Sequence, residues 1–333
     1  MAFRAVSVTV ASIIIMMAST GFAKEDIQFV FKGHTGGATS VAFSPNGRLL
    51  AVGCNDGSAK LWDTATGKEL RQWQAHDGTY CRVAFSPDGK TIATGAGTKF
   101  TGESDLKIRL WDARSGKEIG SLAGHQGGIN AIAFSPNGKL LLSGGNPILG
   151  GQPGEARVWD LAAMKEIESL GGHKDSVVAV SFSPDGKTFA TGEGSFGAGL
   201  HVWDTESRKL RFVIKGGSGF AFSPDGKQLV SQHGNSVVFS DSSSGKELDS
   251  IANVDKYVIR IALSGDGKTL AVSGKDTRVV LWDVAKSKEK AVADAFFRDI
   301  VVSMAFSPDG KTLATGSLDT RVVIWNVGNL PAP

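Results

Sequence analysis

Short apolar runs recur along the chain, and polar, turn-forming residues separate them. The pattern is clearest near the C-terminus, where VVSMAF (301–306), KTLATGS (311–317) and RVVIWNV (321–327) follow one another. Runs of this length that are rich in Val, Ile, Thr and aromatic side chains are typical of β-strands. Earlier in the chain a fourth run follows a polar turn, as in KELRQW (68–73) and KEIGSL (117–122). The pattern therefore predicts units of four short strands.

These units repeat seven times. The turn after the first strand of a unit reads FSPDGKT at 85–91, 182–188 and 306–312. Related turns occupy the other four units: FSPNGRL (43–49), FSPNGKL (134–140), FSPDGKQ (222–228) and LSGDGKT (263–269). A Trp-Asp pair or a substitute for it follows each turn: Trp62-Asp63, Trp111-Asp112, Trp159-Asp160, Trp203-Asp204, Ser240-Asp241, Trp282-Asp283 and Trp325-Asn326. Gly-His or Ala-His precedes the first four units. A sequence unit that recurs at regular intervals, as this one does, indicates a repeat architecture.

Gly-His, Ser-Pro-Asp-Gly and Trp-Asp in this order resemble the WD40 family over about residues 27–327. The resemblance implies an all-β fold, a seven-bladed β-propeller of four-stranded antiparallel blades around a central channel. A fourth-strand sequence, DIQFVF (26–31), precedes the first Gly-His, and the last repeat ends after a third strand. We therefore expect residues 27–32 to complete the last blade beside 321–327, which closes the ring and removes a free sheet edge. Residues 24–333 would form a single domain.

The resemblance also implies a hydrogen-bonded set of four side chains in each blade. The second repeat matches it fully with His76, Thr94, Asp105 and Trp111. The third and fourth repeats lack the aligned Asp, and in the seventh Phe297 replaces the His. Buried polar groups that satisfy one another stabilise a fold, so we assign these residues a structural rather than a catalytic role.

The N-terminus has the organisation of a secretory signal. A basic start, MAFR, precedes the apolar run AVSVTVASIIIMMA, and the small residues Gly21 and Ala23 follow. We expect cleavage after Ala23, which gives a secreted or periplasmic protein without a membrane span. The alternatives are an uncleaved anchor, or a misassigned start and a cytoplasmic protein.

Charge and cysteine content limit the classes of partner and ligand that we expect. The 36 basic and 33 acidic residues give a net charge of +3 and form no basic stripe, so nucleic acid is not an expected partner. Cys54 and Cys81 fit no metal motif. They are either two small core residues or, in an exported protein, a disulfide.

The recurring Gly-Lys-Thr raises the question of a phosphate-binding loop. Such a loop needs a glycine five residues before the Gly-Lys pair and a helix after it. The chain has Ala84, Ser181, Ala262 and Ala305 at that position, and strands are expected to follow. The expected channel-lining strands carry no Asp, Glu or His, and their ionisable residues are Arg82, Arg260 and Cys81. We therefore predict no catalytic residues, no metal and no cofactor.

The repeats differ mainly between the second and third strands. The distance from the Ser of the turn to the Asp or Asn of the Trp-Asp position is 19, 26, 25, 21, 18, 19 and 19 residues in order. The additional residues of repeats two to four would form a ridge on the top face, the face that also carries the Gly-His loops. The predicted contact residues of this ridge are Lys99, Phe100, Glu103, Ile148, Leu149, Gln152, Glu155, Glu193 and Phe196. The alternative is tolerated loop growth with side chains packed inwards.

Three more contact residues, Tyr80, Tyr257 and Arg298, precede first strands, and Tyr and Arg are common interface anchors. The sequence thus predicts an exported, non-catalytic scaffold, monomeric by itself, that holds a protein or peptide of unknown identity on its top face. The alternatives are a propeller enzyme, either a hydrolase or a lyase, and an intracellular adaptor.

Overall fold

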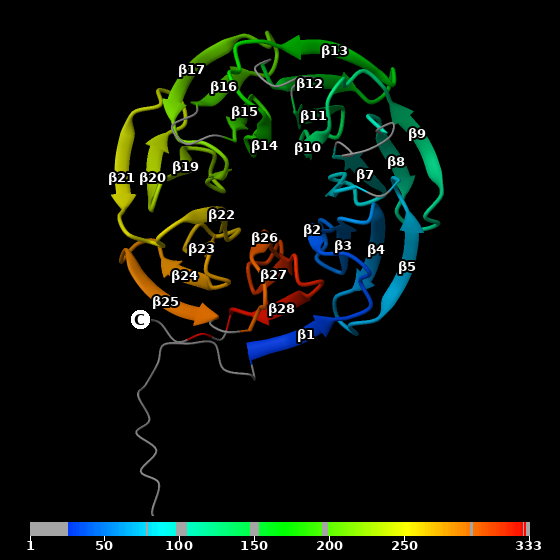
Figure 1. Ribbon diagram of the computed structural model, residues 1–333. Coiled ribbons are helices and arrows are strands. Elements are labelled where there is room, and N and C mark those ends of the chain that lie inside the picture. Colours follow the sequence, from blue (N-terminus) through cyan, green and yellow to red (C-terminus); the bar gives the residue numbers. More distant parts are fainter. Residues whose placement is uncertain are drawn as a thin grey trace, which may run out of the picture.

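Seven four-stranded antiparallel sheets form a ring in the computed structural model (Figure 1). The structure describes residues 26–77, 79–97, 105–146, 153–194, 199–293, 296–328 and 330. The predicted signal segment, residues 1–23, lies outside the described residues. Within the described ranges, no helix has the length and apolar character needed to cross a bilayer.

The strands fall into four layers from the channel outwards (Figure 1). The inner layer is β2 (Ala38–Phe43), β6 (Cys81–Phe85), β10 (Ile129–Phe134), β14 (Val177–Phe182), β18 (Phe220–Phe222), β22 (Val258–Leu263) and β26 (Val301–Phe306). The second is β3 (Leu49–Cys54), β7 (Thr91–Ala96), β11 (Leu140–Gly145), β15 (Thr188–Glu193), β19 (Gln228–His233), β23 (Thr269–Gly274) and β27 (Thr312–Ser317). The third is β4 (Ser58–Asp63), β8 (Ile108–Asp112), β12 (Glu155–Asp160), β16 (Gly199–Asp204), β20 (Ser236–Asp241), β24 (Val279–Asp283) and β28 (Val322–Asn326). The outer is β5 (Glu69–Gln74), β9 (Glu118–Leu122), β13 (Lys165–Leu170), β17 (Leu210–Lys215), β21 (Glu247–Ile251), β25 (Lys288–Ala293) and β1 (Ile27–Phe31). Blades 1 to 6 begin at β2, β6, β10, β14, β18 and β22, and β26–β28 with β1 form blade 7.

The first strand of the chain closes the ring. Figure 1 shows β1 beside β28, and the two pair antiparallel with Phe29 opposite Ile324 and Phe31 opposite Val322. The predicted completion of the last blade by the N-terminal strand is therefore confirmed. β1 supplies the outer strand of blade 7, so this blade has four strands like the other six. The edge of β28 is therefore paired, and the ring is closed.

The Ser-Pro-Asp-Gly segments are turns between the inner and second strands. In blade 2 the Ser86 hydroxyl lies 2.6 Å from Asp88 Oδ1 and accepts a hydrogen bond from the Thr91 amide at 2.9 Å. Gly89 donates its amide to the Ser86 carbonyl and has a φ of 70°, a conformation that favours glycine. The Gly-Lys-Thr that follows therefore enters a strand rather than a phosphate-binding helix.

The core lies between blades rather than within one. The Trp of each third strand packs against the preceding blade, as Trp111 does against Leu61 of blade 1. Blade 5 has Ser240 at this position, and its interface with blade 4 has the smallest buried cluster: Ala190, Leu200, Val202 and Leu229. The partly buried rings of Phe212, Phe220 and Phe222 pack against this cluster, so aromatic side chains line this interface without a fully buried indole.

The two cysteines belong to this core. Both are free and fully buried, Cys54 between blades 7 and 1 and Cys81 between blades 1 and 2. Burial raises the pKa of Cys54 to about 11, so its thiol is protonated at neutral pH. The core alternative accounts for these residues.

Candidate functional site

The structure brings the predicted hydrogen-bonded set of blade 2 together. Thr94 Oγ1 lies 2.9 Å from His76 Nε2 and accepts a bond from the Trp111 indole at 2.8 Å. His76 Nδ1 lies 3.0 Å from Asp105 Oδ2, which also accepts a bond from Arg109. Burial holds the pKa of His76 below its usual range in spite of the carboxylate, so the ring is neutral. All of its polar atoms are used within the blade, which leaves this histidine no free group for catalysis.

Blade 3 has the same arrangement with a different acid. Glu155 Oε2 lies 2.8 Å from His125 Nδ1, and His125 Nε2 lies 2.6 Å from Ser143 Oγ. The third repeat lacks the aligned Asp, and Glu155 is predicted to lie on the exposed ridge, but its side chain is only 13% exposed. Glu155 stands two positions nearer to Trp159 than Asp105 does to Trp111, and its additional methylene lets it reach the ring. Its position is therefore corrected from the ridge to the blade interior.

Glu193 requires the same correction. Its carboxylate is buried and accepts hydrogen bonds from the backbone amides of Lys174 and Gly199 at 2.5 and 2.9 Å. It also lies 3.5 Å from His201 Nε2. A buried carboxylate needs such donors, and this one holds the ends of the long loop of blade 4 together. The sequence signal for this structural role is an acidic residue at one end of a glycine-rich loop: Glu155 follows such a loop, and Glu193 precedes one.

A substitution distinguishes the two positions considered for Glu155. Glu155→Ala should lower the free energy of unfolding by about 1–3 kcal/mol, because His125 Nδ1 would lose its partner inside the blade. Glu247 provides a control, since it is an exposed acid on an outer strand and its replacement should change stability by less than about 0.5 kcal/mol. Urea unfolding measures both. If the two variants are equally stable, Glu155 does not stabilise the blade interior, and the prediction that it lies on the ridge stands.

Seven predicted contact residues of the ridge lie outside the described residues: Lys99, Phe100, Glu103, Ile148, Leu149, Gln152 and Phe196. The other three contact residues are described and exposed. Tyr80 and Tyr257 are 43% and 40% exposed, and Arg298 is also exposed. They precede β6, β22 and β26, which places all three at the top face.

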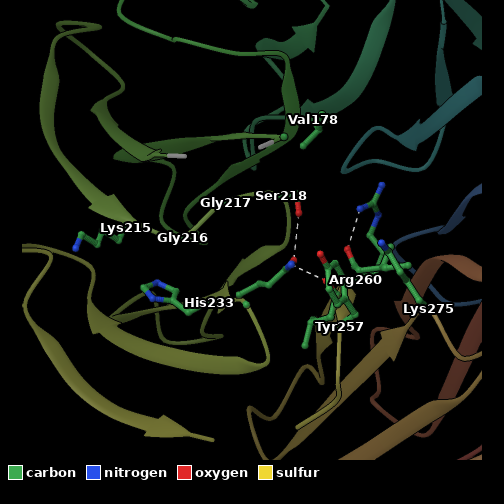
Figure 2. Close-up of a pocket in the computed structure, with 14 residues that line it drawn as sticks. Val178, Lys215, Gly216, Gly217, Ser218, His233, Tyr257, Arg260 and Lys275 are labelled. Carbon is green, nitrogen blue, oxygen red and sulfur yellow. Dashed lines mark hydrogen bonds between the residues drawn. The ribbon is translucent and has the colours of Figure 1, made fainter. Parts of the chain in front are cut away.

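A cavity of about 450 Å³ opens on the top face between blades 4, 5 and 6. Figure 2 shows Gly216 and His233 on one side of it, and Tyr257, Arg260 and Lys275 on the other. The inner strand of blade 5 has three residues, because it begins only after the segment GGSG (216–219). The space that a longer strand would fill remains open. Sequence reasoning missed this cavity, although the glycine-rich segment 216–219 lies in its wall.

A second, smaller cavity of about 200 Å³ lies in the central channel. The inner strands of six blades line it, and Arg82 and Arg260 supply its charged groups. Val178 and Arg260 line both cavities, so the channel and the top-face cavity are neighbours. Among the described residues, no group of three or more His, Cys, Asp and Glu side chains is arranged to hold a metal ion.

Comparisons with known proteins identify one repeat family. The family model for the WD domain, G-beta repeat matches residues 25–63, 67–112, 246–283 and 296–326. A second family model, described as eukaryotic translation initiation factor eIF2A, matches residues 97–208.

The similar curated proteins match over one repeat. Ribosome biogenesis protein BOP1 homolog of Arabidopsis thaliana is 43% identical over 44 residues, which are 13% of this chain and 6% of that protein. A probable E3 ubiquitin ligase complex SCF subunit, sconB of Aspergillus oryzae, is 52% identical over 42 residues, again 13% and 6%. Ribosome biogenesis protein erb1 of Botryotinia fuckeliana is 44% identical over 48 residues, 14% and 6%. The chain thus matches a small fraction of the length of each.

Proposed function

Because the chain belongs to the WD40-repeat family, we propose that it is a non-catalytic scaffold that holds a protein partner on the top face. The observation that carries the proposal is the gathering of recognition features at that end of the ring. The larger cavity and the exposed Tyr80 and Tyr257 lie there, and each tyrosine directly precedes the first residue of an inner strand, β6 or β22. Aromatic side chains around a concave site are typical of protein recognition.

The use of the histidines supports binding rather than chemistry. His76 and His125 each contact a hydroxyl and a carboxylate of their own blade, and both are buried. Burial lowers the pKa of both rings, so they are poor proton acceptors at neutral pH. The nearest carboxylates, those of Asp105 and Glu155, take part in the same hydrogen bonds. This arrangement favours the scaffold over the hydrolase or lyase alternative.

The scaffold could act in either of two locations, inside the cell or after export. The relatives named for ribosome biogenesis and for a ubiquitin ligase complex, together with the translation initiation factor family model, favour the intracellular adaptor over the exported scaffold. Export depends on residues 1–23, which lie outside the described residues. N-terminal sequencing of protein from the native host tests export: a chain that starts at Lys24 supports it, and one that retains residues 1–23 contradicts cleavage after Ala23.

Affinity capture with matched variants tests the binding face. Replacing both Tyr80 and Tyr257 by Ala should reduce recovery of a specific partner at least about ten-fold, because exposed tyrosines are common interface anchors and Tyr257 also lines the cavity. The control replaces Ile119 and Leu248, which are comparably exposed on the outer strands β9 and β21. Quantitative mass spectrometry compares the captured proteins. Loss of the same partner from both variants, or from neither, would contradict a top-face site.

A further inference from the structure

Two arginines enter the central channel from strands that face each other across it. Arg82 is the second residue of β6 in blade 2, and Arg260 is the third residue of β22 in blade 6. Arg82 donates to the carbonyl of Thr39 in blade 1, and Arg260 Nε donates to the carbonyl of Val302 in blade 7 at 3.1 Å. Blades 1 and 7 are adjacent, so each side chain extends towards the other. Both line the channel cavity.

The hydrogen bonds found for these guanidinium groups leave much of their capacity unused. Arg260 Nη1 also donates to the Ile259 carbonyl at 2.9 Å. Arg82 Nε is buried and has no hydrogen-bond partner among the described residues. A guanidinium has five N–H donors arranged to hold a carboxylate or phosphate through two parallel bonds. The Nη2 groups of both arginines take part in none of these bonds, so the pair keeps donors for an anion in the channel.

The charge of the pair is not balanced by acid. The ion pairs formed within the described residues do not include Arg82 or Arg260. The seven inner strands contain no Asp or Glu. Burial and, to a smaller extent, the charge of Arg82 together lower the pKa of Arg260 to about 10. Two like charges in a partly dry channel are unfavourable without a counter-charge, so an anion that enters gains free energy from both.

The neighbouring cavity between blades 4, 5 and 6 indicates which kind of molecule supplies the anionic group. It shares Arg260 with the channel, has Lys215 and Lys275 at its edge, and contains no acid among its lining residues. It also presents Tyr257 and the apolar side chains of Val178 and Ile259. At about 450 Å³ it is much larger than a carboxylate or a phosphate ion needs. The surface next to the arginines thus suits the apolar and backbone groups of an extended chain.

We propose that the channel mouth binds an acidic peptide segment of a protein partner. The carboxylate of an Asp or Glu side chain enters between Arg82 and Arg260, and the flanking residues occupy the cavity between blades 4, 5 and 6. This inference rests on the proposed scaffold function and gives its partner a chemistry. The lysines at the rim attract acidic segments and suppress basic ones.

Fluorescence anisotropy with two labelled peptides, hexaglutamate and hexaglutamine, tests the inference. Hexaglutamate should bind to the full chain at least about ten-fold more tightly than hexaglutamine. Replacing both Arg82 and Arg260 by Gln should weaken hexaglutamate binding at least about ten-fold. The control is Arg48→Gln with Arg114→Gln, which makes the same charge change at exposed turns on the opposite face and should leave binding within about two-fold. Equal losses in both double variants would show non-specific attraction and overturn the proposal.

Further measurements separate the remaining outcomes. The melting temperature of the Gln variant should equal or exceed that of the native chain, because two like charges have been removed. If that variant does not fold, Arg82→Lys and Arg260→Lys keep the charge but lose the two-bond geometry, and each should weaken hexaglutamate binding about three-fold or more. Inorganic phosphate that stabilises the native chain while hexaglutamate does not bind would identify a small-anion site instead. Partner capture that survives while hexaglutamate fails would overturn the acidic segment but not the scaffold.

Discussion

Replacing Trp111 by Ala should lower the free energy of unfolding by about 3–5 kcal/mol. The indole fills the interface between blades 1 and 2 beside Leu61 and Val83, and it lies 5.8 Å from the Trp73 ring. Its N–H donates to Thr94 Oγ1. The substitution would therefore leave a cavity between two blades and remove a donor from a buried hydroxyl. Urea unfolding followed by tryptophan fluorescence or circular dichroism measures the change.

Two further variants divide this effect into parts. Trp111→Phe keeps a smaller ring in the interface and removes the N–H with part of the indole, so it should cost about 1–2 kcal/mol, less than Trp111→Ala. Leu70→Ala truncates a large apolar side chain that is 50% exposed on the outer strand β5, and it should change stability by less than about 0.5 kcal/mol. Unfolding midpoints of Trp111→Ala and Leu70→Ala that coincide would show that the interface does not depend on the indole.

Acid should destabilise the propeller between pH 6.5 and pH 4. Burial lowers the pKa of His34 and of His173 to about 4, whereas an unfolded chain has histidine pKa values near 6.5. Above pH 6.5 both rings are neutral in both states, so stability is complete. Below that pH the unfolded chain binds protons that the folded chain refuses, and by pH 4.5 each histidine should have cost about 2–3 kcal/mol. The aspartates of the turns act in the same direction, but only nearer to their own lower pKa values.

The chain itself suggests the control for this effect. Blade 7 places Phe297, which is buried, at the position that His34 holds in blade 1. His34→Phe should keep the packing and remove one titrating group. Denaturant unfolding from pH 7.5 down to pH 4.5 should then show a shallower loss of stability, by up to about one proton in the slope. An identical slope for the native chain and this variant would mean that His34 does not titrate in this window.

Sequence reasoning succeeded where structure follows from local chemistry. The seven turns depend on residues two to five positions apart, such as Ser86, Asp88 and Thr91, and these contacts form within one hairpin. The pairing of β1 with β28 is distant in sequence, but the unpaired fourth strand at one end and the missing one at the other predicted it. The structure also brings together His76, Thr94, Asp105 and Trp111 at the positions expected from the repeat.

Sequence reasoning failed where the result depends on side-chain reach or on several blades at once. Glu155 replaces an aspartate because a longer side chain can act from a different position in the strand, which alignment by residue type does not detect. The cavity of the top face arises because β18 begins late between two complete blades. Such a space has no motif of its own, since its walls come from blades 4, 5 and 6.

Ring closure by β1 also fixes the order in which the chain can fold. Blades 1 to 6 are each made from one continuous stretch of sequence, so each can form its hairpins as soon as that stretch is available. Blade 7 needs β1 from one end of the described chain and β28 from the other. Contacts between such distant segments form slowly because a long loop must close. The N-terminal strand must therefore remain unpaired until the rest of the ring has been synthesised, and its edge is the part of the nascent chain most open to pairing with another molecule.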